Sequence, residues 1–130
     1  MAVNTESILD STKKYLGLGA DYDVFDQDIM MHINAVFVNL QQLGIGPAEG
    51  FAIENAEATW DAFLGTQPLL NPAKQYMFFK VRLAFDPPPT SFHISSLEKQ
   101  IQELEFRMTV TRDELLAAGS AISIVDPTAI

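Results

Sequence analysis

Four aspartates in a short stretch are the first candidates for chemistry. Asp21, Asp23, Asp26 and Asp28 lie close together, and clustered carboxylates are typical calcium ligands. An EF-hand loop that starts at Asp21 needs glycine at its sixth position and glutamate at its twelfth. This chain has Asp26 and His32 at those positions. The misfit favours a solvated helix entrance, where the helix dipole stabilises negative charge, over a metal site.

Three glycines and two histidines are the next candidates. Gly44, Gly46 and Gly50 depart by one residue from the dinucleotide-binding spacing, and a helix, not a strand, is expected before them. The sequence contains neither a Walker motif nor a Gly-x-Ser-x-Gly elbow. His32 and His93 have no metal-ligand spacing to each other or to carboxylates. We therefore predict a helix-ending turn at the glycines, structural histidines, no cofactor and no metal.

The remaining reactive side chains form no recognisable catalytic group. Cysteine is absent, which excludes disulfides, thiolate zinc sites and cysteine nucleophiles. The 17 acidic residues are abundant, but no pair stands out. Lys74, Lys80 and Arg82 are interpreted as a solvated face that balances the acids, not as a phosphate-contacting patch. We predict a protein that is not an enzyme, with a metal-dependent hydrolase or nuclease as an alternative.

The composition is that of one globular domain. The chain has 130 residues, of which 48% are hydrophobic and 19% charged. A net charge of −9 gives no general attraction to phosphate backbones or to anionic membrane surfaces. No stretch approaches the ~20 apolar residues that span a bilayer, and residues 1–10 lack the apolar run of a signal peptide. We expect a protein made in the cytoplasm, without a membrane partner.

The candidate side chains must be positioned by the secondary structure around them. Apolar residues recur at helical spacing along the chain, which predicts an all-α fold, a small bundle of four to five helices. The clearest apolar face consists of Ile29, Ile33, Val36, Phe37 and Leu40. The expected helices cover residues 5–16, 21–43, 59–64, 71–85 and 90–108.

Local signals predict where these helices begin and end. Thr5 is expected to cap the first helix, and Asn71 with Pro72 is expected to open the fourth. The prolines at residues 87–89 must end that helix, because proline lacks the N–H donor. Trp60, the single tryptophan, is predicted to be a core anchor, since an indole ring buries a large area.

The end of the chain differs from the rest. Residues 119–127 are β-prone but have no predicted strand to pair with. We expect residues 1–110 to form a helical domain and residues 111–130 to form an extended C-terminal arm that a partner orders. Ile122, Ile124 and Val125 are the predicted partner interface.

Several segments, taken in order, carry a family resemblance. The most specific are KQYMFFKVRLAFDPPPTSF at residues 74–92 and LEKQIQELEFR at residues 97–107. They follow SILDSTKKYLG at 7–17, LGIGP at 43–47 and TWDAFL at 59–64. Over residues 8–110 the chain resembles the head–tail connector proteins, also called head-completion or adaptor proteins, of tailed bacteriophages. None of the shared segments is a catalytic motif.

The resemblance implies a structural virion protein made in the host cytoplasm. Its helical connector domain would form a homo-oligomeric ring, usually a dodecamer, beneath the portal protein. The ring would extend the DNA channel and offer a docking surface to a tail or neck protein, and an acidic lining would let DNA pass without specific binding. The alternative is a helical protein-interaction module that is not an enzyme and forms no ring.

Overall fold

The computed structural model describes residues 6–118, and within them it contains five helices and no strand. The helices are α1 (Ile8–Tyr15), α2 (Asp26–Gln42), α3 (Trp60–Leu64), α4 (Leu70–Phe85) and α5 (Ser91–Ala117). This confirms the predicted all-α class. None of the described helices is both long and apolar enough to cross a membrane.

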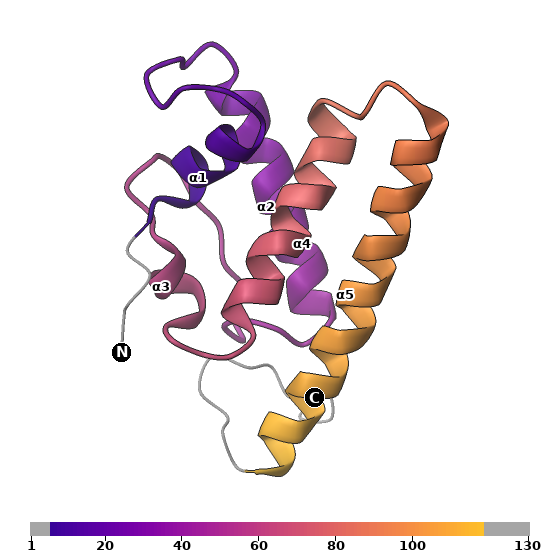
Figure 1. The fold of residues 1–130 in the computed structure, drawn as a ribbon. Helices are drawn as coiled ribbons and strands as arrows, with labels where there is room; N and C mark the ends of the chain where they lie inside the picture. Colours follow the sequence, from indigo (N-terminus) through magenta and orange to yellow (C-terminus); the bar gives the residue numbers. More distant parts are fainter. Residues whose placement is uncertain (1–5, 119–130) are drawn as a thin grey trace.

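The three long helices run side by side, with α4 between α2 and α5 (Figure 1). The short helix α1 packs against both α2 and α4. The predicted face of α2 is fully buried against this layer, and Leu97, Ile101 and Met108 of α5 pack from the other side. Because α4 separates the two outer helices, α2 and α5 each keep one long face turned away from the core.

An aromatic cluster fills the space between α2, α3 and the loop that joins them. Trp60 is completely buried, as predicted, and the ring centroids of Phe37 and Phe63 lie 4.7 Å apart. Gly46 approaches this cluster with a φ of +106°, and a Cβ at this position would lie 2.6 Å from Cε1 of Phe63. A side chain is therefore excluded at Gly46 both by backbone conformation and by space.

The N-termini of the first and fourth helices differ from the prediction. Ser7, not Thr5, caps α1, and its hydroxyl accepts a hydrogen bond from the backbone N–H of Asp10 at 3.2 Å. Helix α4 begins at Leu70, after Leu69, so Asn71 is not its cap. Leu69 and Leu70 are both buried, and the helix begins before the position that the Asn71 cap signal indicates, because this start packs both leucines into the core. Pro72 is tolerated because N–H groups in a first turn have no partner within the helix.

The N-terminus of α2 and the C-terminus of α5 also differ. Helix α2 begins at Asp26, so the segment from residue 21 that was predicted helical is a turn. Helix α5 does not end near Met108 but continues to Ala117. Met108 is completely buried, and Nη1 of Arg112 donates to the carbonyl of Leu43 at the end of α2. These contacts hold the additional turns of α5 against the core.

The last helix therefore crosses residue 110 without a break. The division into a domain of residues 1–110 and an arm of residues 111–130 stays a prediction. Ile122, Ile124 and Val125, the predicted partner interface, lie outside the described residues.

Candidate assembly surfaces

The described residues contain no group of three histidine, cysteine or acidic side chains that could hold a metal ion. His32 on α2 is half-buried and meets the ring of Phe85 edge-on at 6.4 Å. His93, in the first turn of α5, is exposed, and its backbone N–H donates to the hydroxyl of Thr90, which caps the helix. Both histidines have the structural surroundings that their sequence context predicted.

The aspartate cluster is divided between surface and core. Asp21, Asp23 and Asp28 are exposed around the start of α2. Oδ1 of Asp26 instead lies 2.8 Å from Nζ of Lys13, a side chain only 1% exposed that also donates to the carbonyl of Ala20 at 3.0 Å. This ion pair ties α1 to the first turn of α2. Sequence reasoning missed it, because the two residues belong to different helices and neither position signals burial.

Two tyrosines between helices have raised pKa values. Burial is the main cause at Tyr76, and the hydrogen bond that its hydroxyl donates to Oε2 of Glu105 at 2.7 Å raises the pKa further. Burial also raises the pKa of Tyr15, although the neighbouring Arg82 opposes this effect. Both hydroxyls therefore stay protonated at neutral pH. They serve as hydrogen-bonding groups between helices, not as bases.

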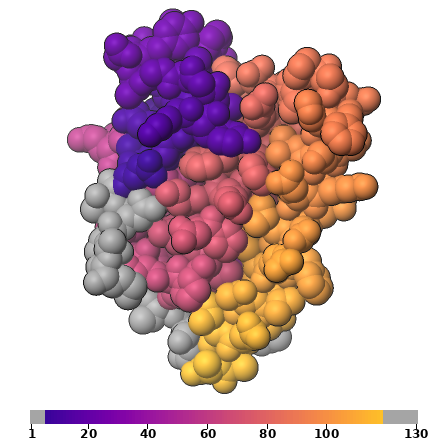
Figure 2. Space-filling model, in the orientation of Figure 1, coloured from indigo at the N-terminus to yellow at the C-terminus, as the bar shows by residue number. Residues whose placement is uncertain are grey.

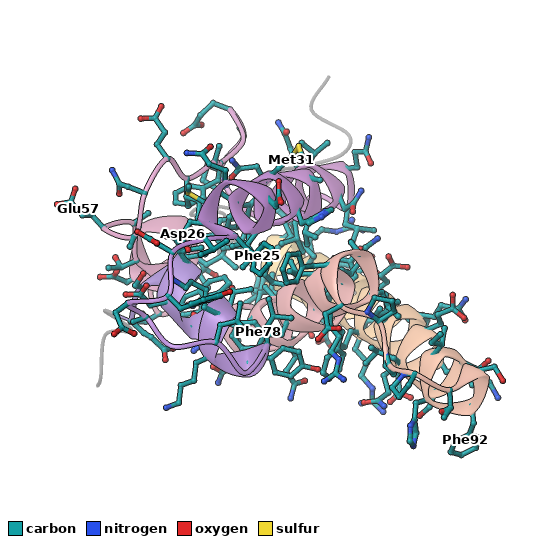
Figure 3. All side chains as sticks on the ribbon, turned by 90° about the horizontal axis from the view of Figure 1, so that it is seen from above. Phe25, Asp26, Met31, Glu57, Phe78 and Phe92 are labelled. Carbon is teal, nitrogen blue, oxygen red and sulfur yellow. The ribbon has the colours of Figure 1, made fainter. Side chains whose placement is uncertain are left out.

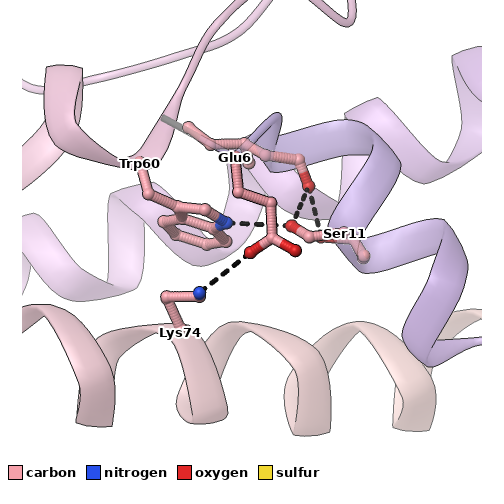
Figure 4. Close-up of polar contacts among 6 residues, drawn as sticks. Glu6, Ser11, Trp60 and Lys74 are labelled. Carbon is pink, nitrogen blue, oxygen red and sulfur yellow. Dashed lines mark hydrogen bonds and ion pairs between the residues drawn. The ribbon is translucent and has the colours of Figure 1, made fainter. Parts of the chain in front are cut away.

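The three cations of α4 have separate partners. Nζ of Lys74 pairs with the carboxylate of Glu6 at 3.0 Å and lies 5.7 Å from the centre of the Trp60 ring (Figure 4). Lys80 lies over the ring of Tyr76 at 5.5 Å. Arg82 faces Tyr15. All three are partly buried, so the predicted solvated face is wrong in detail. Because aromatic rings and acids occupy them, they present no phosphate-binding cluster.

An acidic loop between α2 and α3 is held in place by side-chain amides of α2. Asn34 donates from Nδ2 to the carbonyl of Ile53 at 3.0 Å and accepts from its N–H at 2.8 Å. The loop carries Glu49, Glu54 and Glu57, all exposed, and it contains no basic residue between Gly44 and Trp60. Glu57 projects away from the body of the protein (Figure 3). A fixed loop with this charge is a surface that repels phosphate.

Helix α2 has a second apolar stripe, directly opposite its buried face. Met31 is 62% and Val38 52% exposed, and the exposed Ala35 lies between them. Their spacing of four and three residues places them on one side of the helix. Sequence reasoning did not single them out, although the spacing was visible.

Helix α5 also has an outward apolar stripe. Phe92, Phe106 and Val110 are 76%, 68% and 41% exposed, and intervals of fourteen and four residues return them to one side of the helix. Phe106 and Val110 line a shallow hollow of about 380 Å³ together with Glu103, Arg107 and Thr111. In the space-filling view α5 forms a continuous band along one side of the molecule (Figure 2).

Comparison with known proteins gives one family. Residues 8–115 match the family model described as phage connector protein. No curated protein and no solved structure matches the chain. The match begins at the first residue of α1 and ends in the last turn of α5, so it covers nearly all of the described structure.

Proposed function

The chain belongs to the phage connector protein family, and we propose that its copies form a ring beneath the portal of the filled phage head. Its coarse role follows from the family: it is a structural connector of the phage particle and a component of the virion. The ring, which we propose to be a dodecamer, extends the DNA channel. It also offers a docking surface to a tail or neck protein.

The observation that carries the proposal is the extent of the family match. It includes α1 to α4 complete and α5 to within two residues of its end, so the folded body as a whole, not one motif, is connector-like. The family model agrees with the resemblance found in residues 8–110. A structural role also agrees with the described side chains, whose buried ionisable groups pair with neighbours in the fold.

The charge of the protein supports the proposed passage of DNA. The chain has a formal net charge of −9, and two described segments contribute exposed acids to it. One is the loop with Glu49, Glu54 and Glu57, and the other is the turn with Asp21 and Asp23. We propose that the loop lines the channel, because Asn34 fixes it and a fixed lining neither folds over the DNA nor binds it.

We propose that the C-terminal arm, residues 111–130, takes part in assembly. The apolar residues Ile122, Ile124 and Val125 contact the portal protein or a neighbouring copy when the ring forms, and the protein is made in the host cytoplasm before assembly. Removing residues 120–130 should then abolish assembly, either of the ring itself or of the ring on the portal. A full-length control with Ser120→Ala and Ser123→Ala should attach normally, and a truncated protein that completes heads normally contradicts the role of the arm.

Electron microscopy and mass photometry of the purified protein test the ring directly. The protein is examined alone and with the portal protein of the same phage. Ring-shaped particles of many copies, alone or seated on the portal, are the expected result. A protein that stays a monomer or dimer in both samples contradicts the proposal and favours an interaction module without ring symmetry.

The acidic lining has its own test. Replacing Glu49, Glu54 and Glu57 by glutamine removes three negative charges from the loop, so the ring should bind duplex DNA more tightly at low salt. A matched variant with Asp86→Asn, Glu98→Gln and Glu114→Gln removes the same charge at exposed positions outside the loop and should bind DNA as the wild type does. Equal DNA binding by both variants contradicts a channel-facing loop.

A further inference from the structure

The two outward apolar stripes lie on opposite sides of the molecule. Helices α2 and α5 flank α4, and each buries its other face against the core (Figure 1). Seen from above, Met31 and Phe92 point away from each other at opposite edges of the protein (Figure 3). A single partner that covers one stripe therefore leaves the other exposed to water.

The stripes differ in shape. The side of α2 presents separate side chains of moderate size, Met31 and Val38. The side of α5 presents a hollow of about 380 Å³, between Phe106 and Val110. An unbranched, flexible methionine side chain is well suited to fill an irregular apolar hollow. The surfaces are thus complementary to each other rather than to themselves.

The stripes differ in charge as well. Helix α2 contains no lysine or arginine. The exposed Asp28 lies one turn before Met31 on its outward side, whereas Asp26 is paired with Lys13. Helix α5 has the exposed Lys99 on the side of its stripe. Arg107, on the same side, is already paired with Glu103 at 2.9 Å. Contact between two α2 stripes would bring the two Asp28 carboxylates together, whereas contact between α2 and α5 offers Asp28 the exposed ammonium of Lys99.

We propose that the outward stripe of α2 on one copy packs against the outward stripe of α5 on the next copy. This inference deepens the proposed ring and rests on it. Because two different surfaces meet, the contact is heterologous, and such contacts generate closed rings when the rotation between copies closes. Every copy in the ring then has both stripes covered.

Two variants each disable one stripe. Met31→Asp with Val38→Asp places two charges in the α2 stripe, and Phe106→Asp with Val110→Asp places two in the α5 stripe. All four side chains are exposed in the single copy, so each variant should fold with the helical content of the wild type. A control with Ala62→Asp and Thr66→Asp adds the same charge at exposed positions in and just after α3, outside both stripes.

The assay is the mass distribution of each protein by mass photometry and light scattering over a range of concentrations. Wild type and control should form rings. Each variant should need about 100-fold more protein for half-assembly, since an unpaired charge buried in an interface costs at least that factor. Mixed together, the two variants should form a one-to-one dimer that grows no further, because each retains the stripe that the other lacks.

The outcomes separate this inference from the ring proposal. If the wild type forms rings and both stripe variants form them equally well, the pairing of the stripes is overturned and the ring proposal stands. Mixed variants that stay monomeric overturn the heterologous pairing. A wild type that stays monomeric, with and without the portal protein, overturns both. A variant with altered helical content by circular dichroism is replaced by its serine counterpart, which adds no charge, and the same outcomes apply.

Discussion

Replacing Lys13 by methionine removes a buried ammonium while keeping most of the volume of the side chain. The wild-type Nζ pairs with Oδ1 of Asp26 at 2.8 Å and donates to the carbonyl of Ala20 at 3.0 Å. In the variant both oxygens lose this partner. Oδ1 of Asp26 is itself buried and accepts no other well-aligned hydrogen bond among the described residues. The carboxylate must then turn toward water or remain uncompensated.

The magnitude follows from the burial of the two side chains. Breaking a buried ion pair by removing one partner costs about 3–5 kcal/mol. The side chain of Asp26 is 26% exposed and can recover part of its hydration, so we expect about 3 kcal/mol. With roughly 2.1 cal/mol/K of unfolding entropy per residue, this lowers Tm by about 11 °C for a chain of this length.

Thermal melting followed by circular dichroism at 222 nm measures the loss. Melts at two protein concentrations are compared, because assembly raises the apparent stability of the folded state. Lys14→Met is the matched control: Lys14 is the exposed neighbour in the same helix, and its replacement should change stability by less than about 0.5 kcal/mol. Adding Asp26→Asn to Lys13→Met should cost less than the sum of the single changes.

Two results would refute the reasoning about this ion pair. One is a Lys13→Met variant whose Tm equals that of the Lys14→Met control. The other is a double variant whose loss equals the sum of the two single losses, since that would mean that the charges do not interact.

Three further predictions concern the loop, the turn and the contact between α4 and α5. Asn34→Ala leaves both backbone groups of Ile53 without partners, and it should cost about 2 kcal/mol and abolish hydrogen-exchange protection of the Ile53 amide. Gly46→Ala strains a φ of +106° and meets the Phe63 ring, so unfolding in urea should show a loss of more than about 2 kcal/mol. The pKa of Tyr76 is raised in the folded protein, so its contribution to stability is complete below the tyrosine pKa of the unfolded chain, about 10, and falls as pH rises above that value. Tyr76→Phe should remove this part of the alkaline loss of Tm.

Each of the three has a control within the chain. Asn71→Ala changes an exposed asparagine and should leave the exchange of the Ile53 amide unchanged. Gly17→Ala has a φ of +85° but open space around the added Cβ, so it should cost less than Gly46→Ala, and equal costs contradict the proposed clash. Tyr22→Phe alters an exposed tyrosine. If it changes the alkaline slope as much as Tyr76→Phe does, the assignment to Tyr76 is wrong.

Helices and core faces were predictable because they depend on local spacing. The five apolar residues of α2 are all buried, and Trp60 is an anchor as expected. Helix ends were less predictable. Ser7 replaced Thr5 as a cap, and α5 extended beyond residue 108. In both cases contacts with distant parts of the chain decide: the Ser7 hydroxyl donates to the carbonyl of Ala56, and Arg112 binds the end of α2.

The candidate surfaces were less predictable than the helices. The spacing of Met31 and Val38 shows that they share a side of α2, but spacing alone does not say whether that side is covered. The spacing of Phe106 and Val110 on α5 likewise does not say whether a neighbouring helix covers them. Burial by a neighbouring helix is a property of the packed bundle, and here α4 covers only one side of each outer helix.

The sequence by itself determined the helical class, the absence of thiol chemistry, the acidity and the membership of the connector family, because composition, local periodicity and family pattern are all carried by the linear chain. Tertiary structure alone decided that Lys13 is buried beside Asp26, that Asn34 fixes the acidic loop and that two apolar stripes face opposite directions. These features depend on residues that are distant in sequence and meet only when the helices pack. A helix face stays exposed to solvent where the single copy has no further element to cover it.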